Sequence, residues 1–122
     1  MKVAGIGFRA EASVASLRAA LAAAGGAEGV TALATSEAKA GAAAILAFAA
    51  ELGLPVVGVS AANLAAQVTL TESARVRAKT GAGSLAEAAA LAAIGSDARL
   101  LGPRAVSGDH MATAAIAVGV VR

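Results

Sequence analysis

Short apolar runs alternate along this chain with longer alanine-rich segments of helical spacing, and this alternation limits the fold more than any other feature. Glycine follows several of the runs and segments, which marks where they end. Strands that alternate with helices indicate an α/β fold. We expect a three-layer α/β/α sandwich with a small, mostly parallel or mixed sheet of about five strands. The expected strands are residues 3–6, 30–34, 54–59, 99–101 and 112–121, and the expected helices are residues 13–24, 36–52, 60–65 and 85–94.

The 122 residues fit one domain, residues 1–122, which is long enough for a real core but too short for two. Hydrophobic residues make up 58% of the chain and aromatic residues only 2%. The excess is alanine, so we expect the helices to pack closely. The longest uncharged stretch, residues 52–71, is interrupted by polar residues, Gly and Pro, and the N-terminus lacks a signal-like apolar run. We therefore expect a cytoplasmic protein with no membrane partner.

Composition also excludes several kinds of chemistry. The chain has no cysteine, which rules out disulfides, thiolate catalysis and cysteine-based zinc sites. One histidine and scattered carboxylates do not form a recognisable ligand set, so we expect no metal site and no cofactor. The net charge is only +2 and Tyr and Trp are absent, so a stacking platform for nucleic acid is missing. Nucleic-acid binding is therefore disfavoured.

Residues 72–87 have the pattern of an anion-binding segment. Arg75, Arg77 and Lys79 alternate with small or β-branched residues, so an extended segment would present all three cations on one side. Gly81 and Gly83 follow, and glycine lets backbone N–H groups approach a ligand. The alternative is an ordinary loop with a solvated charged edge, because short glycine motifs are weak evidence.

Ser84 and Glu87 have the spacing of a capping box in front of the expected helix 85–94. We expect Glu87 to complete this cap by accepting from the Ser84 backbone N–H rather than to act as a base. The free N–H groups and positive dipole end of such a helix favour carboxylate or phosphate. The sequence therefore predicts a negatively charged small ligand near Ser84.

The carboxyl ends of the first two expected strands lead into further polar residues. Gly7 and Arg9 follow the first strand, and Thr35 and Lys39 follow the second. Ligands of open α/β sheets bind beyond the carboxyl ends of strands, so these residues are expected around one mouth with the basic segment. A cation in a first helical turn is disfavoured, which suggests that Lys39 is held there for an anion or a nearby carboxylate. We expect Lys39→Ala to weaken binding without loss of stability.

His110, the only histidine, stands beside Asp109 just before the last expected strand. The pair could supply a general acid or base if it met at the mouth. A solvated turn is the favoured interpretation, because neighbouring turn residues need not point together. We therefore expect His110 to be dispensable, and the sequence identifies no catalytic residue.

Residues spread along the chain form a set that is specific in its joint order and spacing: Gly5, Ile6, Gly7, Arg9, Ala34, Thr35, Lys39, Leu52, Gly53, Leu54, Pro55, Ser73, Gly81, residues 84–91, Thr113 and Ala115. In these residues the chain resembles the CobE-type family of cobalamin-biosynthesis proteins, which also forms the C-terminal domain of the corrin-ring lactone hydrolase CbiG. The resemblance covers nearly the whole chain. Two differences stand out: Phe8 replaces a cysteine found in many relatives, and Arg104 replaces a lysine.

This resemblance implies a role in building the corrin ring of vitamin B12, on an intermediate rimmed with acetate and propionate carboxylates. Any cobalt would belong to that ligand. A carrier or accessory protein is the first interpretation; an enzyme such as a lactone hydrolase and a generic phosphate or nucleotide binder are the alternatives. Other pathway enzymes as partners and a homo-oligomer stay open. The expected ligand-binding residues are Gly7, Arg9, Thr35, Lys39, Ser73, Gly81, Gly83 and Ser84.

Overall fold

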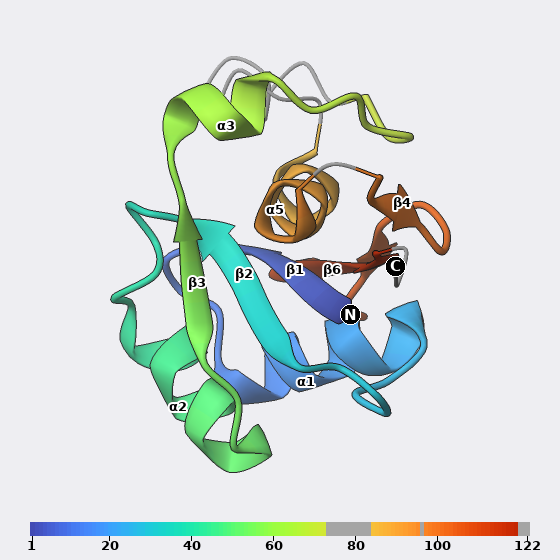
Figure 1. The fold of residues 1–122 in the computed structure, drawn as a ribbon. Helices are drawn as coiled ribbons and strands as arrows, with labels where there is room; N and C mark the ends of the chain where they lie inside the picture. Colours follow the sequence, from blue (N-terminus) through green and yellow to red (C-terminus); the bar gives the residue numbers. More distant parts are fainter. Residues whose placement is uncertain (73–83, 96, 120–122) are drawn as a thin grey trace.

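A mixed six-stranded sheet forms the centre of the molecule (Figure 1). The computed structural model describes residues 1–72, 84–95 and 97–119. The elements of these ranges are the strands β1 (Lys2–Phe8), β2 (Ala32–Ser36), β3 (Val56–Val59), β4 (Arg99–Leu100), β5 (Ala105–Val106) and β6 (Ala112–Val118), and the helices α1 (Val14–Ala24), α2 (Ala43–Leu52), α3 (Ala61–Ala65) and α5 (Leu85–Ile94).

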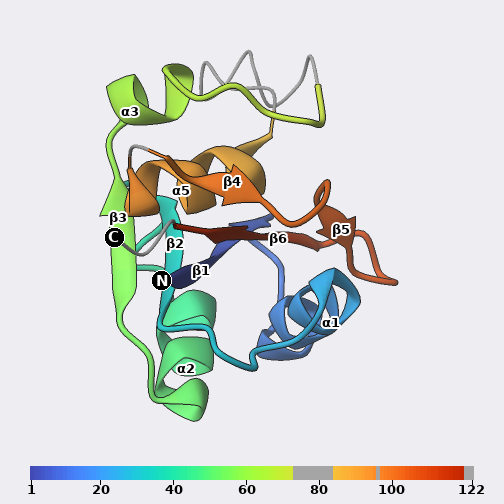
Figure 2. The same ribbon diagram turned by 45° about the vertical axis from the view of Figure 1, so that its right-hand side comes forward.

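The strands follow the order β3, β2, β1, β6, β4, with β5 also paired to β6. β1, β2 and β3 run parallel, whereas β6 is antiparallel to β1, β4 and β5. Helices α1 and α2 cover one face of the sheet, and α5 and α3 lie on the other (Figures 1 and 2). The predicted α/β sandwich with a mixed sheet is therefore confirmed. The strand missing from the prediction is β5, which has two residues.

The two faces of the sheet are filled in different ways. Larger side chains fill the face under α1 and α2, where Leu17, Leu33 and Phe48 are buried. Alanine fills the other face, so that α5 approaches the sheet closely. A Cβ atom added to Gly5 of β1 would lie 1.8 Å from the carbonyl oxygen of Ala86. Backbone packs directly on backbone there, which agrees with the close helix packing that the alanine content predicts.

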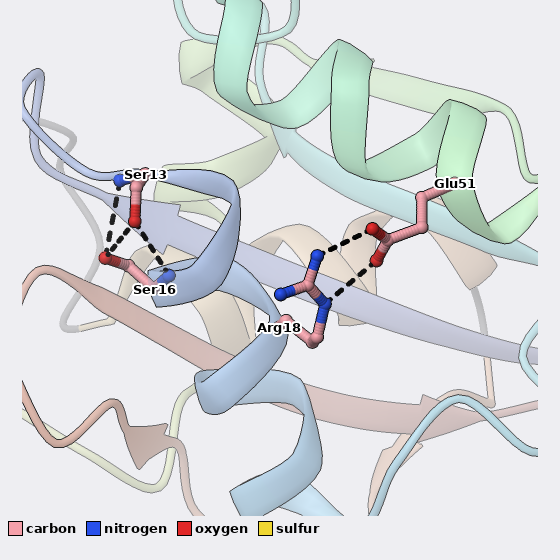
Figure 3. A network of polar contacts seen from close by, with 4 residues as sticks. All are labelled: Ser13, Ser16, Arg18 and Glu51. Atoms are coloured by element: carbon pink, nitrogen blue, oxygen red, sulfur yellow. Dashed lines mark hydrogen bonds and ion pairs between the residues drawn. The ribbon is translucent and has the colours of Figure 1, made fainter.

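Polar side chains fix the start of α1 and its contact with α2 (Figure 3). Ser13 caps the helix by accepting from the Ser16 N–H at 3.2 Å, and Ser16 Oγ accepts from the Ser13 N–H at 3.3 Å. Arg18 in turn forms two hydrogen bonds to the Glu51 carboxylate of α2, at 2.6 and 3.0 Å. Both partners of this pair are exposed, so it adds little stability.

The second helix is shorter than the sequence predicts. The expected helix 36–52 begins only at Ala43, because residues 37–41 form hydrogen-bonded turns after β2. Lys39 and Ala40 both donate N–H bonds to the Ser36 carbonyl there. Alanine-rich sequence favours helix throughout this stretch, but Gly41 lies within it and the chain has to turn from the sheet to the helix layer. Lys39 is therefore a turn residue, not a first-turn helix residue.

Within the described ranges, no helix is long and apolar enough to cross a membrane.

Candidate functional site

The carboxyl ends of β1, β2 and β3 and the N-terminal end of α5 lie at one edge of the sheet. The three strands are parallel, so their carboxyl ends share that edge. Leu85, the first residue of α5, packs above Gly7 near the end of β1, while Ile94 at the other end of α5 packs against Gly119. α5 therefore runs opposite to β1, and its N-terminal end lies at the edge, on the side of β5 in Figure 2. We call this region the carboxyl edge.

Gly7 and Arg9 differ in how they contribute to the carboxyl edge. The sequence places Gly7 in a loop, but it lies inside β1 and is buried. A Cβ on Gly7 would come within 2.7 Å of Thr113 Oγ1, so the position is needed for close packing of β1, β6 and α5. Arg9 follows directly after β1. Its side chain is exposed, while its N–H donates to the Met111 carbonyl at 2.9 Å.

Lys39 connects the turn after β2 to the end of β1. Its Nζ donates to the Phe8 carbonyl oxygen and lies 5.0 Å from the centroid of the Phe8 ring. The side chain is half-buried. Because Lys39 is not in a helix, the argument that it opposes a helix dipole no longer applies. Its bond to Phe8 also gives it a structural role, so its replacement should lower stability as well.

Thr35 lies one residue before the end of β2 and is completely buried. Its position alternates with Ala34 and matches that of Leu33, so it faces the α1 and α2 side. Within the described ranges, Thr35 Oγ1 has no hydrogen-bond partner. A buried hydroxyl left without a partner costs about 1–3 kcal/mol and calls for an explanation.

Ser84 caps α5 as predicted, since its Oγ accepts from the Glu87 N–H at 3.4 Å. The expected partner of Glu87 is wrong. Its carboxylate is wholly buried; Oε1 accepts from the N–H groups of Leu70 and Thr71 at 2.6 and 2.8 Å. Oε2 accepts from Thr71 Oγ1 at 2.5 Å and from the Arg104 N–H at 2.7 Å. The sequence held one clue, because a lone carboxylate inside an otherwise apolar helix needs buried partners.

The remaining predicted ligand-binding residues, Ser73, Gly81 and Gly83, lie outside the described residues, as do Arg75, Arg77 and Lys79. Their part in binding stays a prediction.

Asp109 forms a hydrogen-bond network with α1 instead of a pair with His110. Its carboxylate accepts from Ser107 Oγ and Ser16 Oγ, both at 2.6 Å, and from the Met111 N–H at 3.0 Å. The bonds from Ser107 and then Ser16 lower the pKa of Asp109 to about 2. His110 is exposed on the turn, with φ of 59°, and its N–H donates to the Ser107 carbonyl. This agrees with the turn interpretation.

The carboxyl edge is suited to hold an anion. Arg9 offers an exposed guanidinium, and the first turn of α5 adds the positive end of a helix dipole. Among the described residues, no three His, Asp or Glu side chains are grouped so that they could hold a metal ion.

Comparison with known proteins agrees with this fold. The family model of the cobalamin synthesis G C-terminus matches residues 2–117. The crystal structure of CobE, a protein from the cobalamin (vitamin B12) biosynthetic pathway, is 32% identical with a TM-score of 0.86, and the match covers 100% of this chain and 92% of CobE. The cobalamin biosynthesis protein chiG from Agrobacterium tumefaciens strain C58 is 40% identical with a TM-score of 0.74, over 99% of this chain and 100% of chiG.

A search of curated protein sequences gave no significant match. The family model nevertheless spans nearly all of the chain, and both solved structures share more than 30% of their residues with it over nearly full length. The chain therefore belongs to the family of the cobalamin synthesis G C-terminus, to which the sequence resemblance pointed.

Proposed function

We propose that this protein acts in cobalamin biosynthesis by binding a corrin-ring intermediate with free carboxylates at the carboxyl edge, as a carrier or an accessory to pathway enzymes. One observation carries the proposal: the N-terminal end of α5 lies at the same edge as the exposed Arg9. An exposed cation and a helix N-terminus thus lie at the end of the sheet where α/β proteins bind their ligands.

The chemistry of the edge suits such a ligand. Guanidinium groups pair with carboxylates through two parallel hydrogen bonds, and N–H groups at a helix N-terminus donate to a further carboxylate oxygen. Apolar surface is available for the ring itself. Leu70 is 64% exposed and Val106 is 42% exposed, on segments joined to α5 and β6 beside the edge. A flat macrocycle with a charged rim matches this combination.

The proposal is tested by titrating the full chain with cobyrinic acid, a corrin whose side-chain carboxylates are free, and following visible absorbance. We expect saturable binding that is lost with the fully methyl-esterified corrin. Arg9→Ala should weaken binding by about 10-fold or more, the usual effect of losing a charged hydrogen bond. Lys39→Ala should weaken it too and also lower the melting temperature, because the bond to the Phe8 carbonyl is lost.

Arg99→Ala is the matched control. Arg99 is also exposed, but it pairs with Val118 at the opposite end of the sheet. Equal losses for Arg9→Ala and Arg99→Ala, or equal binding of the acid and the ester, would contradict the proposal. Analysis of the corrin after incubation separates a carrier, which returns it unchanged, from an enzyme.

A further inference from the structure

The buried carboxylate of Glu87 connects three separate parts of the chain at the carboxyl edge. It belongs to the first turn of α5 and accepts hydrogen bonds from Leu70 and Thr71 on one segment and from Arg104 on another. The successive N–H groups of Leu70 and Thr71 have the arrangement of an anion-binding concavity. The protein fills that concavity with a carboxylate of its own.

A purely structural cap would not need this arrangement. Ser84 already satisfies the Glu87 N–H, and the helix layer around it is packed with alanine. A charged group within such a layer is costly to bury unless several donors compensate it. Among the described residues four donors do so, at 2.5 to 2.8 Å, and three of them are backbone N–H groups. What the carboxylate fixes is therefore the path of two loops.

We infer that Glu87 is a positioning residue, which holds the Arg104 backbone at the N-terminus of α5 so that the Arg104 guanidinium can pair with a carboxylate of the ligand. Arg104 is half-buried, and the hydrogen bond from its N–H to Glu87 Oε2 fixes the position of its backbone. A guanidinium on a fixed backbone loses less entropy on binding than one on a mobile loop. This inference rests on the proposed function and adds Arg104 to its ligand contacts.

The variant Glu87→Gln tests the inference selectively. At Oε1 an amide NH2 would face two backbone N–H donors, whereas at Oε2 its neighbours among the described residues are one N–H, that of Arg104, and a hydroxyl that can turn to accept. The amide should therefore take the second orientation and release Arg104 alone. Amide hydrogen exchange should become faster at Arg104 and change less at Leu70 and Thr71.

Binding of cobyrinic acid is then measured in a double-mutant cycle. We expect Glu87→Gln to weaken binding by about 10-fold, and to weaken it by less than about 2-fold when Arg104→Ala is already present. Ile94→Ala, at the far end of α5, serves as the control for lost helix stability and should leave affinity unchanged. A residue with only a structural role would lower the melting temperature but would show no coupling to Arg104 in affinity.

The outcomes separate the two proposals. If wild-type protein does not bind the acid, the proposed function fails and this inference fails with it. Wild-type protein can bind while Glu87→Gln binds equally well, or while Glu87→Gln weakens binding by the same factor with and without Arg104→Ala. Either result overturns only the positioning role. If Glu87→Gln does not fold, Thr71→Val decides, since it removes only the bond from Thr71 Oγ1. It should weaken binding by about 3-fold through Arg104, and unchanged affinity would overturn the inference.

Discussion

Asp109 shows how one side chain can join two elements that are distant in sequence. Its carboxylate accepts from Ser107 beside it and from Ser16 in the first turn of α1. These bonds require the ionised form, and they account for a pKa lowered from 3.8 to about 2. Asp109 thus ties the loop before β6 to the start of α1.

The lowered pKa of Asp109 predicts a pH dependence of stability. A carboxyl group with a depressed pKa in the folded state stabilises that state above its unfolded pKa, and the stabilisation is lost as the pH falls toward the folded pKa. We expect stability to fall between about pH 4 and pH 2, and Asp109→Asn to remove part of that fall. Urea unfolding of wild type and Asp109→Asn across this range measures the loss of stability.

Ser16→Ala should raise the pKa of Asp109, because it removes one of the hydrogen bonds that lower it. An NMR titration measures this pKa, and an unchanged value would contradict the assignment.

For individual residues, the sequence predicted the place in a helix or strand better than the hydrogen-bond partners. Ser84 was correctly expected to cap a helix, because the cap spacing is a local property. The partners of Glu87 could not be predicted, since they come from Thr71 and Arg104, and only the folded chain brings these together. Thr35 Oγ1 is buried without a hydrogen-bond partner among the described residues, and this could not be predicted either, because the side chain continues a strand pattern without any local sign.

Contacts between elements depend on the smallest residues in this chain. α5 presents alanine to the sheet, and β1 presents Gly5 and Gly7 to α5. The helix can settle close to the strand only where side chains are missing. Alanine content predicted this packing in general, but the contact at Gly5 required the structure.

Gly5→Ala should therefore disrupt the docking of α5 on β1. The added Cβ would lie 1.8 Å from the Ala86 carbonyl oxygen, and a backbone atom cannot move aside as a flexible side chain can. We expect a loss of ~3 kcal/mol or more in the free energy of unfolding, measured by urea denaturation. Gly41→Ala, whose Cβ would meet no atom within 4 Å, should stay within ~1 kcal/mol of wild type. Similar stabilities for the two variants would disprove the close-contact argument.

Local propensity misled the prediction where the chain has to change direction. The helix expected from residue 36 begins at Ala43, because residues 37–41 turn away from the sheet first. Alanine and lysine favour helix wherever they occur, so composition cannot mark this boundary. The alternation of strands and helices, by contrast, was predicted correctly, since it follows from the periods of the apolar residues.

The molecule as a whole is organised around one sheet that both helix layers share. Strands β1, β2 and β6 contribute side chains to the cores on both faces, among them Ile6 and Val3, Leu33 and Ala34, and Ile116 and Ala117. If either helix layer came away, it would expose one face of the strands on which the other layer also packs. We therefore expect the chain to behave as a single cooperative unit.

Differential scanning calorimetry tests this expectation. The calorimetric enthalpy should equal the van't Hoff enthalpy in one transition, as for small two-state domains. Two resolved transitions would show that the α5 layer unfolds independently and would contradict the single-domain prediction.

The pairing of β1 with β6 also affects how the protein can be made. Lys2 pairs with Val118 and Phe8 with Ala112, so β1 lies beside a strand that is synthesised more than 100 residues later. During translation β1 can pair with β2, but its other edge has to wait until β6 has left the ribosome. Contacts between such distant segments slow folding and leave strand edges open to aggregation. Expression of this protein should therefore depend on temperature and chaperones more than its small size would suggest.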